Sequence, residues 1–391
     1  MREYTSLRLE ITSNCNLNCE YCHNKEYNNR PQEDMTFDQI KKLIYNLKKK
    51  YSINKILLTG GEPLTNKNVL DIVRFISKLG IKTDMATNGV LLTNNLAKEL
   101  DTAGLKRIRI SIDEDSEPYE LWEKAKMVSM MTKNIEVCIH TVCTPKNING
   151  LYKVYQKVLK CGAKRWRVFD LGFQGGVING NYKFDLSKYY EDYIMNSKTI
   201  LEDYVSSHQD KQLDIEINNI FRTTYLKMEY DPKKQPNVEE LLIKRSKTSP
   251  CDYVTNHQLT IRSDGKATLC QYYHNPIYDY TAHLFDIEES INHENVCLEN
   301  IITINNILPC VGCKYLLLCN SGCRAKAQFL TGSIFDADPI ACYLQPMIEK
   351  QILPVLTENY KSIFNSYIYS NGHNPKYQKN DLQRLLKDKG L

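Results

Sequence analysis

Residues 6–22 read SLRLEITSNCNLNCEYC, in which an alternating apolar stretch leads directly into three cysteines. The period-two alternation of SLRLEIT predicts a β-strand. Up to about residue 170, further short apolar strands alternate with amphipathic helical stretches, beginning with TFDQIKKLIYNLKKK (36–50), KILLT (55–59) and NVLDIVRFISKLG (68–80). Strands that alternate with helices at this interval indicate a parallel sheet.

The first helical stretch shows the pattern most clearly. Ile40, Leu43, Ile44 and Leu47 recur at the three-and-four spacing of one buried face, and Thr36 is placed as the N-terminal cap. Six strand–helix steps precede the point where the pattern weakens, fewer than the eight of a closed barrel. The sequence therefore predicts an α/β fold built on a partial, open (β/α)6 barrel.

Four unusual segments follow the first four predicted strands. They are CNLNCEYC (15–22), GGEP (60–63), TNG (87–89) and SID (111–113). In parallel α/β folds the active site lies at the carboxyl ends of the strands, so these segments converge on one rim. Each taken alone is typical of a turn or a strand end. Together they predict a site, with glycines that let backbone approach closely and a Glu62 carboxylate able to accept from an ammonium group.

The net charge of +5 arises from 51 basic and 46 acidic side chains spread along the chain. This balance predicts neither nucleic-acid nor membrane binding. No apolar run approaches the roughly 18 residues of a membrane-spanning helix, and the first 14 residues lack the apolar stretch of a signal peptide. The sequence predicts a cytoplasmic protein, in which the 14 cysteines point to metal binding or catalysis instead of disulfides.

The rim segments resemble those of radical SAM enzymes. In that family C-x-x-x-C-x-x-C after the first barrel strand holds a four-iron four-sulfur cluster, and GGEP ends the second strand. The resemblance spans residues 6 to 170 and implies that Cys15, Cys19 and Cys22 bind the cluster, whose fourth iron takes the amino and carboxylate groups of S-adenosylmethionine (SAM). It implies six SAM contacts: Tyr21, Gly60, Gly61, Glu62, Asn88 and Ser111. A zinc site of the three cysteines and His23 is the competing interpretation.

A second group of cysteines lies toward the C-terminus. Thirteen residues separate Cys251 from Gly265 and four separate Gly265 from Cys270. Cys310, Cys313, Cys319 and Cys323 follow with two, five and three residues between them, and Cys342 comes last. This pattern resembles the SPASM extension of radical SAM enzymes, which carries two auxiliary four-iron four-sulfur clusters. Two zinc ribbons or a disulfide-bonded module fit the odd number of thiols poorly.

The resemblance divides these cysteines into two ligand sets. One auxiliary cluster is assigned Cys310, Cys313, Cys319 and Cys342. The other, nearer the active site, is assigned Cys251, Cys270 and Cys323, which again leaves one position open. Cys297 is the spare thiol in that region that could reach it, whereas Cys138, Cys143 and Cys161 are expected to be small buried residues. The implied cofactors are SAM and three clusters.

Three domains are predicted from this distribution. Residues 1–235 form the radical SAM partial barrel, residues 236–350 the SPASM domain and residues 351–391 a C-terminal helical tail. The loop GFQGG (172–176) follows the sixth predicted strand and is expected to line the site.

SPASM enzymes mostly act on peptides, so the resemblance implies maturation of a ribosomally made peptide by oxidative modification, crosslinking or epimerisation. A dehydrogenase or epimerase of a sugar or cyclitol is the open alternative. A sulfatase maturase is disfavoured because Gln271 stands where those enzymes carry an aspartate as base. A purely structural iron–sulfur carrier is hard to reconcile with GGEP and Asn88 beside an incomplete cluster.

Partners are expected as well. The chemistry needs an external electron donor, a flavodoxin or ferredoxin. Because the first strand begins at about Ser6, there is no room before it for a peptide-recognition domain, so a separate leader-binding protein is expected unless the substrate has no leader. No general base is assigned; Tyr272, Tyr273 and His274 follow Cys270 closely but are as typical of packing around a cluster.

Overall fold

A computed structural model represents the protein. The residues it describes are 4–114, 119–179, 184–207, 213–222, 231, 237–250, 258–268, 270–273, 278–283 and 302–389. Cys251, His274 and Cys297 lie outside the described residues, so the assignments made for them stay predictions.

One curved sheet of eleven strands organises the described part of the chain, in the order β11-β10-β9-β1-β2-β3-β4-β5-β6-β7-β8. Strands β1 to β7 run parallel, and β9 adds in parallel to β1. Antiparallel strands close both ends of the sheet. The strands are β1 (Ser6–Glu10), β2 (Lys55–Thr59), β3 (Lys82–Thr87), β4 (Leu105–Ser111), β5 (Glu136–Val142), β6 (Arg165–Phe169), β7 (Asp214–Ile217), β8 (Phe221–Arg222), β9 (Gln258–Ile261), β10 (Lys266–Thr268) and β11 (Tyr278–Asp279).

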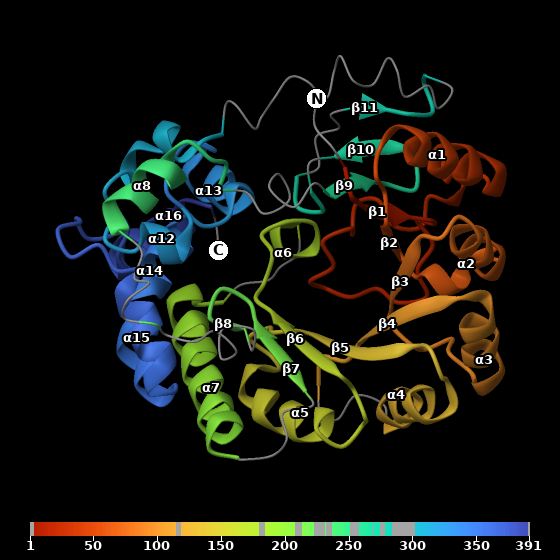
Figure 1. Cartoon of the computed structure of the whole chain (residues 1–391), viewed down its shortest axis with the longest axis horizontal. Coiled ribbons are helices and arrows are strands. Elements are labelled where there is room, and N and C mark those ends of the chain that lie inside the picture. Colours follow the sequence, from red (N-terminus) through yellow and green to blue (C-terminus); the bar gives the residue numbers. More distant parts are fainter. Residues whose placement is uncertain are drawn as a thin grey trace.

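Five helices connect the first six strands and lie along the outer side of the curved sheet (Figure 1). They are α1 (Phe37–Lys50), α2 (Val69–Lys78), α3 (Asn94–Ala103), α4 (Tyr119–Met131) and α5 (Leu151–Val158). In α1 the four predicted apolar residues are buried and Thr36 forms a capping box with Gln39, as the spacing predicts. The predicted partial (β/α) barrel is confirmed.

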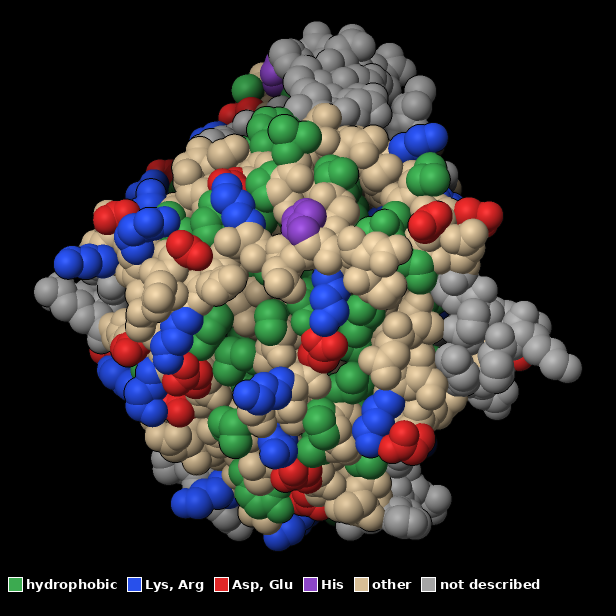
Figure 2. All heavy atoms as spheres, turned by 90° about the vertical axis from the view of Figure 1, so that its left-hand side faces the viewer, with side chains coloured by type: hydrophobic (Ala, Val, Ile, Leu, Met, Phe, Trp, Pro, Cys, Tyr) green, Lys and Arg blue, Asp and Glu red, His purple; other side chains and the backbone are tan. Residues whose placement is uncertain are grey.

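The remaining helices lie mostly on the opposite side of the molecule, at the left of Figure 1. They are α6 (Gly176–Asn179), α7 (Leu186–Ser206), α8 (Val238–Ser246), α12 (Leu316–Cys319), α13 (Arg324–Thr331), α14 (Pro339–Met347), α15 (Glu358–Ser366) and α16 (Lys379–Asp388), with a π-helical turn at Ile348–Ile352. On the face that these helices present, basic and acidic side chains are interspersed (Figure 2). No helix among the described residues is long and apolar enough to span a bilayer.

The sheet crosses one predicted domain boundary. β9 lies after residue 236, yet Leu259 pairs with Leu7 of β1 and is buried in the same core. Tyr360, Phe364 and Leu382, from the predicted C-terminal tail, belong to that core too. A smaller apolar cluster surrounds Cys310, Cys313 and Cys342. The two domain boundaries remain predictions, and residues from all three predicted domains share one core.

Candidate functional site

The cysteine loop between β1 and α1 is held by side chains that bind its backbone. Asp34 accepts hydrogen bonds from the Ser13 amide and the Thr12 hydroxyl, each at 2.9 Å. Asn29 accepts from the Cys15 amide at 3.0 Å, and the amide group of Asn28 donates to the Cys22 sulfur at 3.4 Å. These contacts explain how the cysteine segment, residues 15–22, which lies outside any helix or strand, presents its thiols in a set orientation.

The two glycines of GGEP make room for this loop. A Cβ on Gly60 would lie 2.2 Å from the Thr12 carbonyl oxygen, and one on Gly61 would lie 2.2 Å from that of Asn14. The backbones also pair, because the Gly61 amide donates to Thr12 at 2.9 Å and the Glu62 amide to Asn14 at 2.6 Å. The close approach that the glycines permit is thus first of all to the cysteine loop.

Glu62 is buried at the centre of this junction, with 1% of its surface exposed. Its carboxylate accepts from the Leu64 amide at 2.9 Å, the Thr87 hydroxyl at 2.7 Å and the Asn88 amide at 2.7 Å. Burial raises the pKa of Glu62, although these three donors oppose the rise. A carboxylate has about four acceptor positions, so one remains for a further donor such as an ammonium group.

Two other predicted SAM contacts have partners within the protein. The Asn88 side-chain amide donates to Asn16 of the cysteine loop at 2.8 Å, and its oxygen accepts from the Val90 amide at 3.0 Å. The Tyr21 hydroxyl donates to Asp113, and burial together with Asp113 raises the pKa of Tyr21. Asp113 also accepts from the Val142 amide at 2.7 Å. Hydrogen bonds through the cysteine loop therefore connect the ends of β3, β4 and β5 at the rim of the barrel.

A cavity of about 850 Å³ opens above this rim. It is lined by all the predicted SAM contacts and by the three cysteines of the loop: Tyr21, Gly60, Gly61, Glu62, Asn88, Ser111, Cys15, Cys19 and Cys22. Cys270 and Cys323 line the same cavity, as do Gln271, Tyr272 and Tyr273. The structure thus brings the first cysteine group and two members of the predicted inner set to one space.

The cysteines of the predicted outer cluster lie away from the large cavity, except for Cys319, which lines it. Cys310, Cys313, Cys319 and Cys342 line a small pocket together with Asp338 and Tyr315. Burial and the neighbouring cysteines raise the pKa of Cys319, and burial raises that of Cys342 to about 12. Four thiols gathered around one buried pocket suit an iron–sulfur cluster ligated by four cysteines, whose binding would displace the thiol protons.

The first cysteine group fits a cluster with one open position. Its three thiols line the cavity wall, and burial raises the pKa of Cys15 and Cys22 and raises that of Cys19 to about 11. Among the described residues, no three His, Cys, Asp or Glu side chains lie close enough to share one metal ion. The ligands of a four-iron cluster bind different irons and need not converge on one point.

The sequence did not single out the contacts that join the barrel to the cysteine-rich region. Asp170, at the end of β6, pairs with Lys326 of α13 and accepts from the Tyr190 hydroxyl at 2.9 Å and the Asn218 amide at 2.7 Å. Within the cysteine-rich region, Asp338 accepts from the Cys323 amide at 2.8 Å. Asp170 and Lys326 lie 156 residues apart in the chain, and no local pattern could have paired them.

The GFQGG loop reaches the cysteine loop as well as the cavity. Gly172 lines the cavity, as expected. The Gly176 amide donates to the Cys22 carbonyl at 2.9 Å, and a Cβ on Gly176 would lie 1.8 Å from the Glu20 carbonyl oxygen. A side chain at residue 176 would therefore displace the loop that carries Cys19 and Cys22.

Comparison with known proteins bears on this arrangement. Residues 9–145 match the family model described as Radical SAM superfamily. A protein of Methanocaldococcus jannaschii named "Probable GTP 3',8-cyclase" is 38% identical over 152 residues, which are 38% of this chain and 50% of that protein. An "AdoMet-dependent heme synthase" of Methanosarcina barkeri is 26% identical over 85% of this chain and 95% of its own length. The chain thus covers about half of the first relative.

Solved structures share the fold. The protein anSMEcpe with bound AdoMet superposes with a TM-score of 0.66 over 92% of this chain and 99% of its own, at 16% identity. Streptococcus suis SuiB gives a TM-score of 0.61 over 88% and 78%, at 15% identity. Residues 9–145 thus match the radical SAM superfamily, and the fold of the described chain is that of these two solved structures. SAM and a four-iron four-sulfur cluster are the cofactors of that superfamily.

Proposed function

We propose that the protein cleaves SAM reductively and uses the resulting 5′-deoxyadenosyl radical to abstract a hydrogen atom from a peptide, leading to oxidative modification, crosslinking or epimerisation. The observation that carries the proposal is the shared cavity. The cysteine loop and Glu62 form one wall, and Cys270 and Cys323 form another. A substrate in this space would meet both the radical source and an auxiliary acceptor of electrons.

The residues of the rim have distinct roles in this proposal. Cys15, Cys19 and Cys22 would hold a cluster that, when bound, supplies the electron for SAM cleavage. Glu62 offers its remaining acceptor position to the SAM ammonium group. Tyr21, Gly60, Gly61, Asn88 and Ser111 would shape the rest of the SAM site, because each lines the cavity. The reaction requires that solvent, which would quench a radical, be kept from the bound SAM and substrate.

Two auxiliary clusters are part of the proposal. Cys310, Cys313, Cys319 and Cys342 would hold the outer one in their small pocket. Cys270 and Cys323, with Cys251, would hold the inner one facing the cavity. An external flavodoxin or ferredoxin would supply electrons, and a separate protein would recognise a leader peptide where the substrate carries one.

Two observations support a peptide substrate. The cavity is lined by residues of both the barrel and the cysteine-rich region, and the fold is similar to that of a peptide-binding protein. SuiB, solved with its precursor peptide SuiA, superposes with a TM-score of 0.50 over 69% of this chain and 60% of its own. Gln271 lines the cavity at the position expected of a base in sulfatase maturation, and a neutral amide cannot take a proton. This observation disfavours formylglycine formation.

The second candidate function is a reaction on a small-molecule substrate, as in a dehydrogenase or epimerase of a sugar or cyclitol. The names of the two relatives, a GTP 3′,8-cyclase and a heme synthase, describe small-molecule chemistry, and the second matches nearly its full length. The two candidate functions differ in the substrate that must enter the cavity, a peptide or a small molecule, and an activity assay with each kind of substrate can distinguish them.

The proposal is tested by anaerobic incubation of the reconstituted protein with reductant, SAM and the product of each adjacent gene. Formation of 5′-deoxyadenosine and a peptide lighter by two hydrogens would support oxidation or crosslinking. Deuterium uptake from heavy water without other mass change would support epimerisation. Formation of 5′-deoxyadenosine only with sugar or cyclitol substrates would favour the second candidate, and its absence with every substrate would refute both. A Glu62→Gln variant is expected to bind SAM more weakly.

A further inference from the structure

The inner surface of the barrel carries arginines below the rim on which SAM is proposed to bind. Arg8 on β1, Arg109 on β4 and Arg167 on β6 all line the cavity. Each lies two residues before the end of its strand, whereas GGEP and Asp113 lie beyond the strand ends. The three arginines are therefore farther from the rim than these residues. Since alternate residues of a strand point to the same face, this spacing places their side chains inside the barrel.

Arg8 is the most unusual of the three. It is 8% exposed, and its Nη2 donates to the Thr59 hydroxyl at 3.3 Å, while its Nε has no hydrogen-bond partner. No carboxylate among the described residues forms an ion pair with Arg8. Glu10, two residues along β1, accepts a hydrogen bond from Asn24 at 2.8 Å; burial raises the pKa of Glu10, and the charge of Arg8 opposes that rise. A buried guanidinium with an unused donor is costly unless something pairs with it.

The carboxylates inside the barrel are already shared by several cations. Asp84 contacts Arg109 at 2.5 Å and also Lys55 at 3.0 Å and Arg107 at 3.4 Å. The same holds on β7, where Glu216 accepts from two arginines. Its contacts are Arg167 at 3.0 Å and Arg222 at 3.2 Å.

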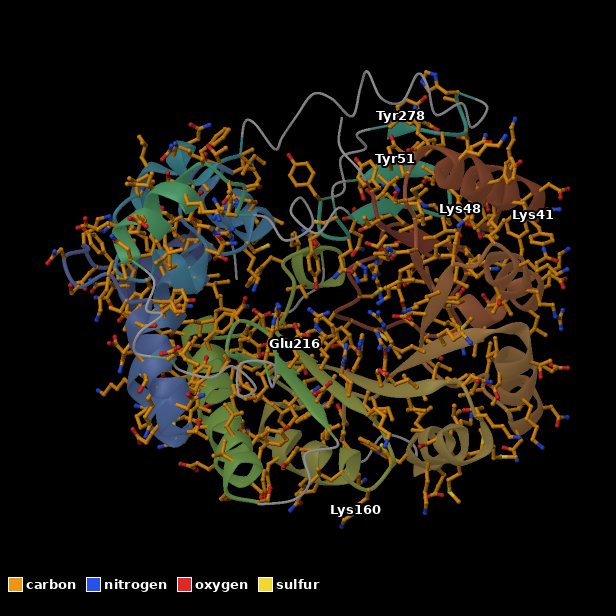
Figure 3. All side chains as sticks on the ribbon, in the orientation of Figure 1. Lys41, Lys48, Tyr51, Lys160, Glu216 and Tyr278 are labelled. Atoms are coloured by element: carbon orange, nitrogen blue, oxygen red, sulfur yellow. The ribbon has the colours of Figure 1, made fainter. Side chains whose placement is uncertain are left out.

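Figure 3 places Glu216 near the middle of the molecule, whereas the labelled lysines Lys41, Lys48 and Lys160 lie toward its outside. Asp84 and Glu216 are thus each shared by at least two cations, and neither pairs with Arg8. Arg167 also retains a buried Nε without a partner.

His140 lies among the same arginines. It lies on β5 beside Arg167 of β6 and lines the cavity. Burial lowers its pKa well below the usual range, and Arg109, Arg167 and Arg8 lower it further. The imidazole is thus neutral, which leaves the arginines as the charges of this surface.

We propose that Arg8, Arg109 and Arg167 bind an anionic group of the substrate, a carboxylate or a phosphate, inside the barrel below the SAM site. The inference deepens the proposed function, on which it rests for the position of the substrate. Guanidinium groups bind both anions through paired N–H donors, and the pairing would satisfy the unused donors of Arg8 and Arg167. The anion would orient the substrate so that its reacting carbon faces the rim.

Anaerobic calorimetry on the reconstituted full chain tests this site, with saturating SAM and ionic strength held constant by chloride. Inorganic phosphate and glutarate are the probes. Saturable binding of either one is expected, and Arg8→Gln should weaken it at least about tenfold because a charge-assisted hydrogen bond is lost. Tighter binding of glutarate would indicate an acidic peptide group, and tighter binding of phosphate a phosphorylated molecule.

Two further variants keep the result decisive. Arg8→Lys retains the charge but not the planar fork and should bind the probe with intermediate affinity, which covers the case that Arg8→Gln does not fold. Arg74→Gln removes the same charge from the surface of α2, where Arg74 pairs with Asp71, and should bind like the parent. The proposal is overturned if neither probe binds, if Arg8→Gln binds the probe like the parent, or if Arg74→Gln is weakened equally. No turnover is measured, so hydrogen abstraction is tested separately.

Discussion

Replacing Lys326 with methionine would remove the cation from a buried ion pair between the cysteine-rich region and the barrel rim. The Lys326 side chain is 11% exposed and that of Asp170 is 1% exposed. Burial lowers the pKa of Lys326, but Asp170 and Asp338 more than reverse the effect and raise it. Lys326 is therefore charged, and the variant would leave Asp170 buried with only neutral partners.

Removing one partner of a buried pair costs about 3–5 kcal/mol. Unfolding entropy is about 2.1 cal/mol/K per residue, and for 391 residues unfolding together it comes to about 0.8 kcal/mol/K. The expected fall in Tm is therefore about 4–6 °C. Anaerobic melting of the reconstituted full chain, followed by circular dichroism, measures this shift.

Two comparisons make the prediction refutable. Lys361→Met breaks an exposed pair with Glu358, whose side chain is 87% exposed, and should lower Tm by no more than about 1 °C. Combining Lys326→Met with Asp170→Asn should recover part of the loss, because no buried charge is left uncompensated. If Lys326→Met melts like Lys361→Met, or if the two losses in the double variant simply add, the assignment of a coupled buried pair is wrong.

Three further perturbations address the cysteine loop, the outer pocket and the barrel interior. Gly176→Ala places a methyl group against the Glu20 carbonyl and should displace the cysteine loop, so that iron content and SAM affinity both fall; unchanged iron content would contradict this. Cys313→Ala should lower iron content by up to one cluster, whereas Cys161→Ala, also at a buried thiol, should leave it unchanged when iron is quantified. His140 stays neutral when folded but takes a proton near pH 6.5 when unfolded, so stability should rise with pH up to that value, by at most about 1.4 kcal/mol per unit. The free energy of unfolding, measured by urea denaturation across this pH range, should depend less steeply on pH in His140→Asn. An unchanged dependence on pH would refute the neutral state assigned to His140.

Local pattern was enough to predict the strand–helix alternation and the order of the rim motifs. The helix α1 shows why, since its buried face and its cap at Thr36 follow from spacing within one turn or two. The carboxyl ends of neighbouring parallel strands meet at one edge, so CNLNCEYC, GGEP, TNG and SID could be placed on a common rim from the sequence alone.

Contacts between distant segments could not be derived in that way. The addition of β9 to β1 joins residues that the sequence assigned to different domains, and no periodicity within either segment specifies its partner. The glycines of GGEP were interpreted as space for a ligand, yet the nearest obstacles to a side chain there are the carbonyls of Thr12 and Asn14. Chain spacing shows where a glycine lies but not what approaches it.

The sequence by itself determined the class of fold and the spacing of the cysteines, and it carried the resemblance to radical SAM enzymes, because these depend on short-range periodicity and on covalent spacing. The tertiary structure alone decided which groups share a space. It brought Cys270 and Cys323 to the cavity of the first cysteine loop, paired Lys326 with Asp170, and left Arg8 inside the barrel with a free donor. Burial and charge compensation are properties of the packed chain, and they depend on neighbours that only folding supplies.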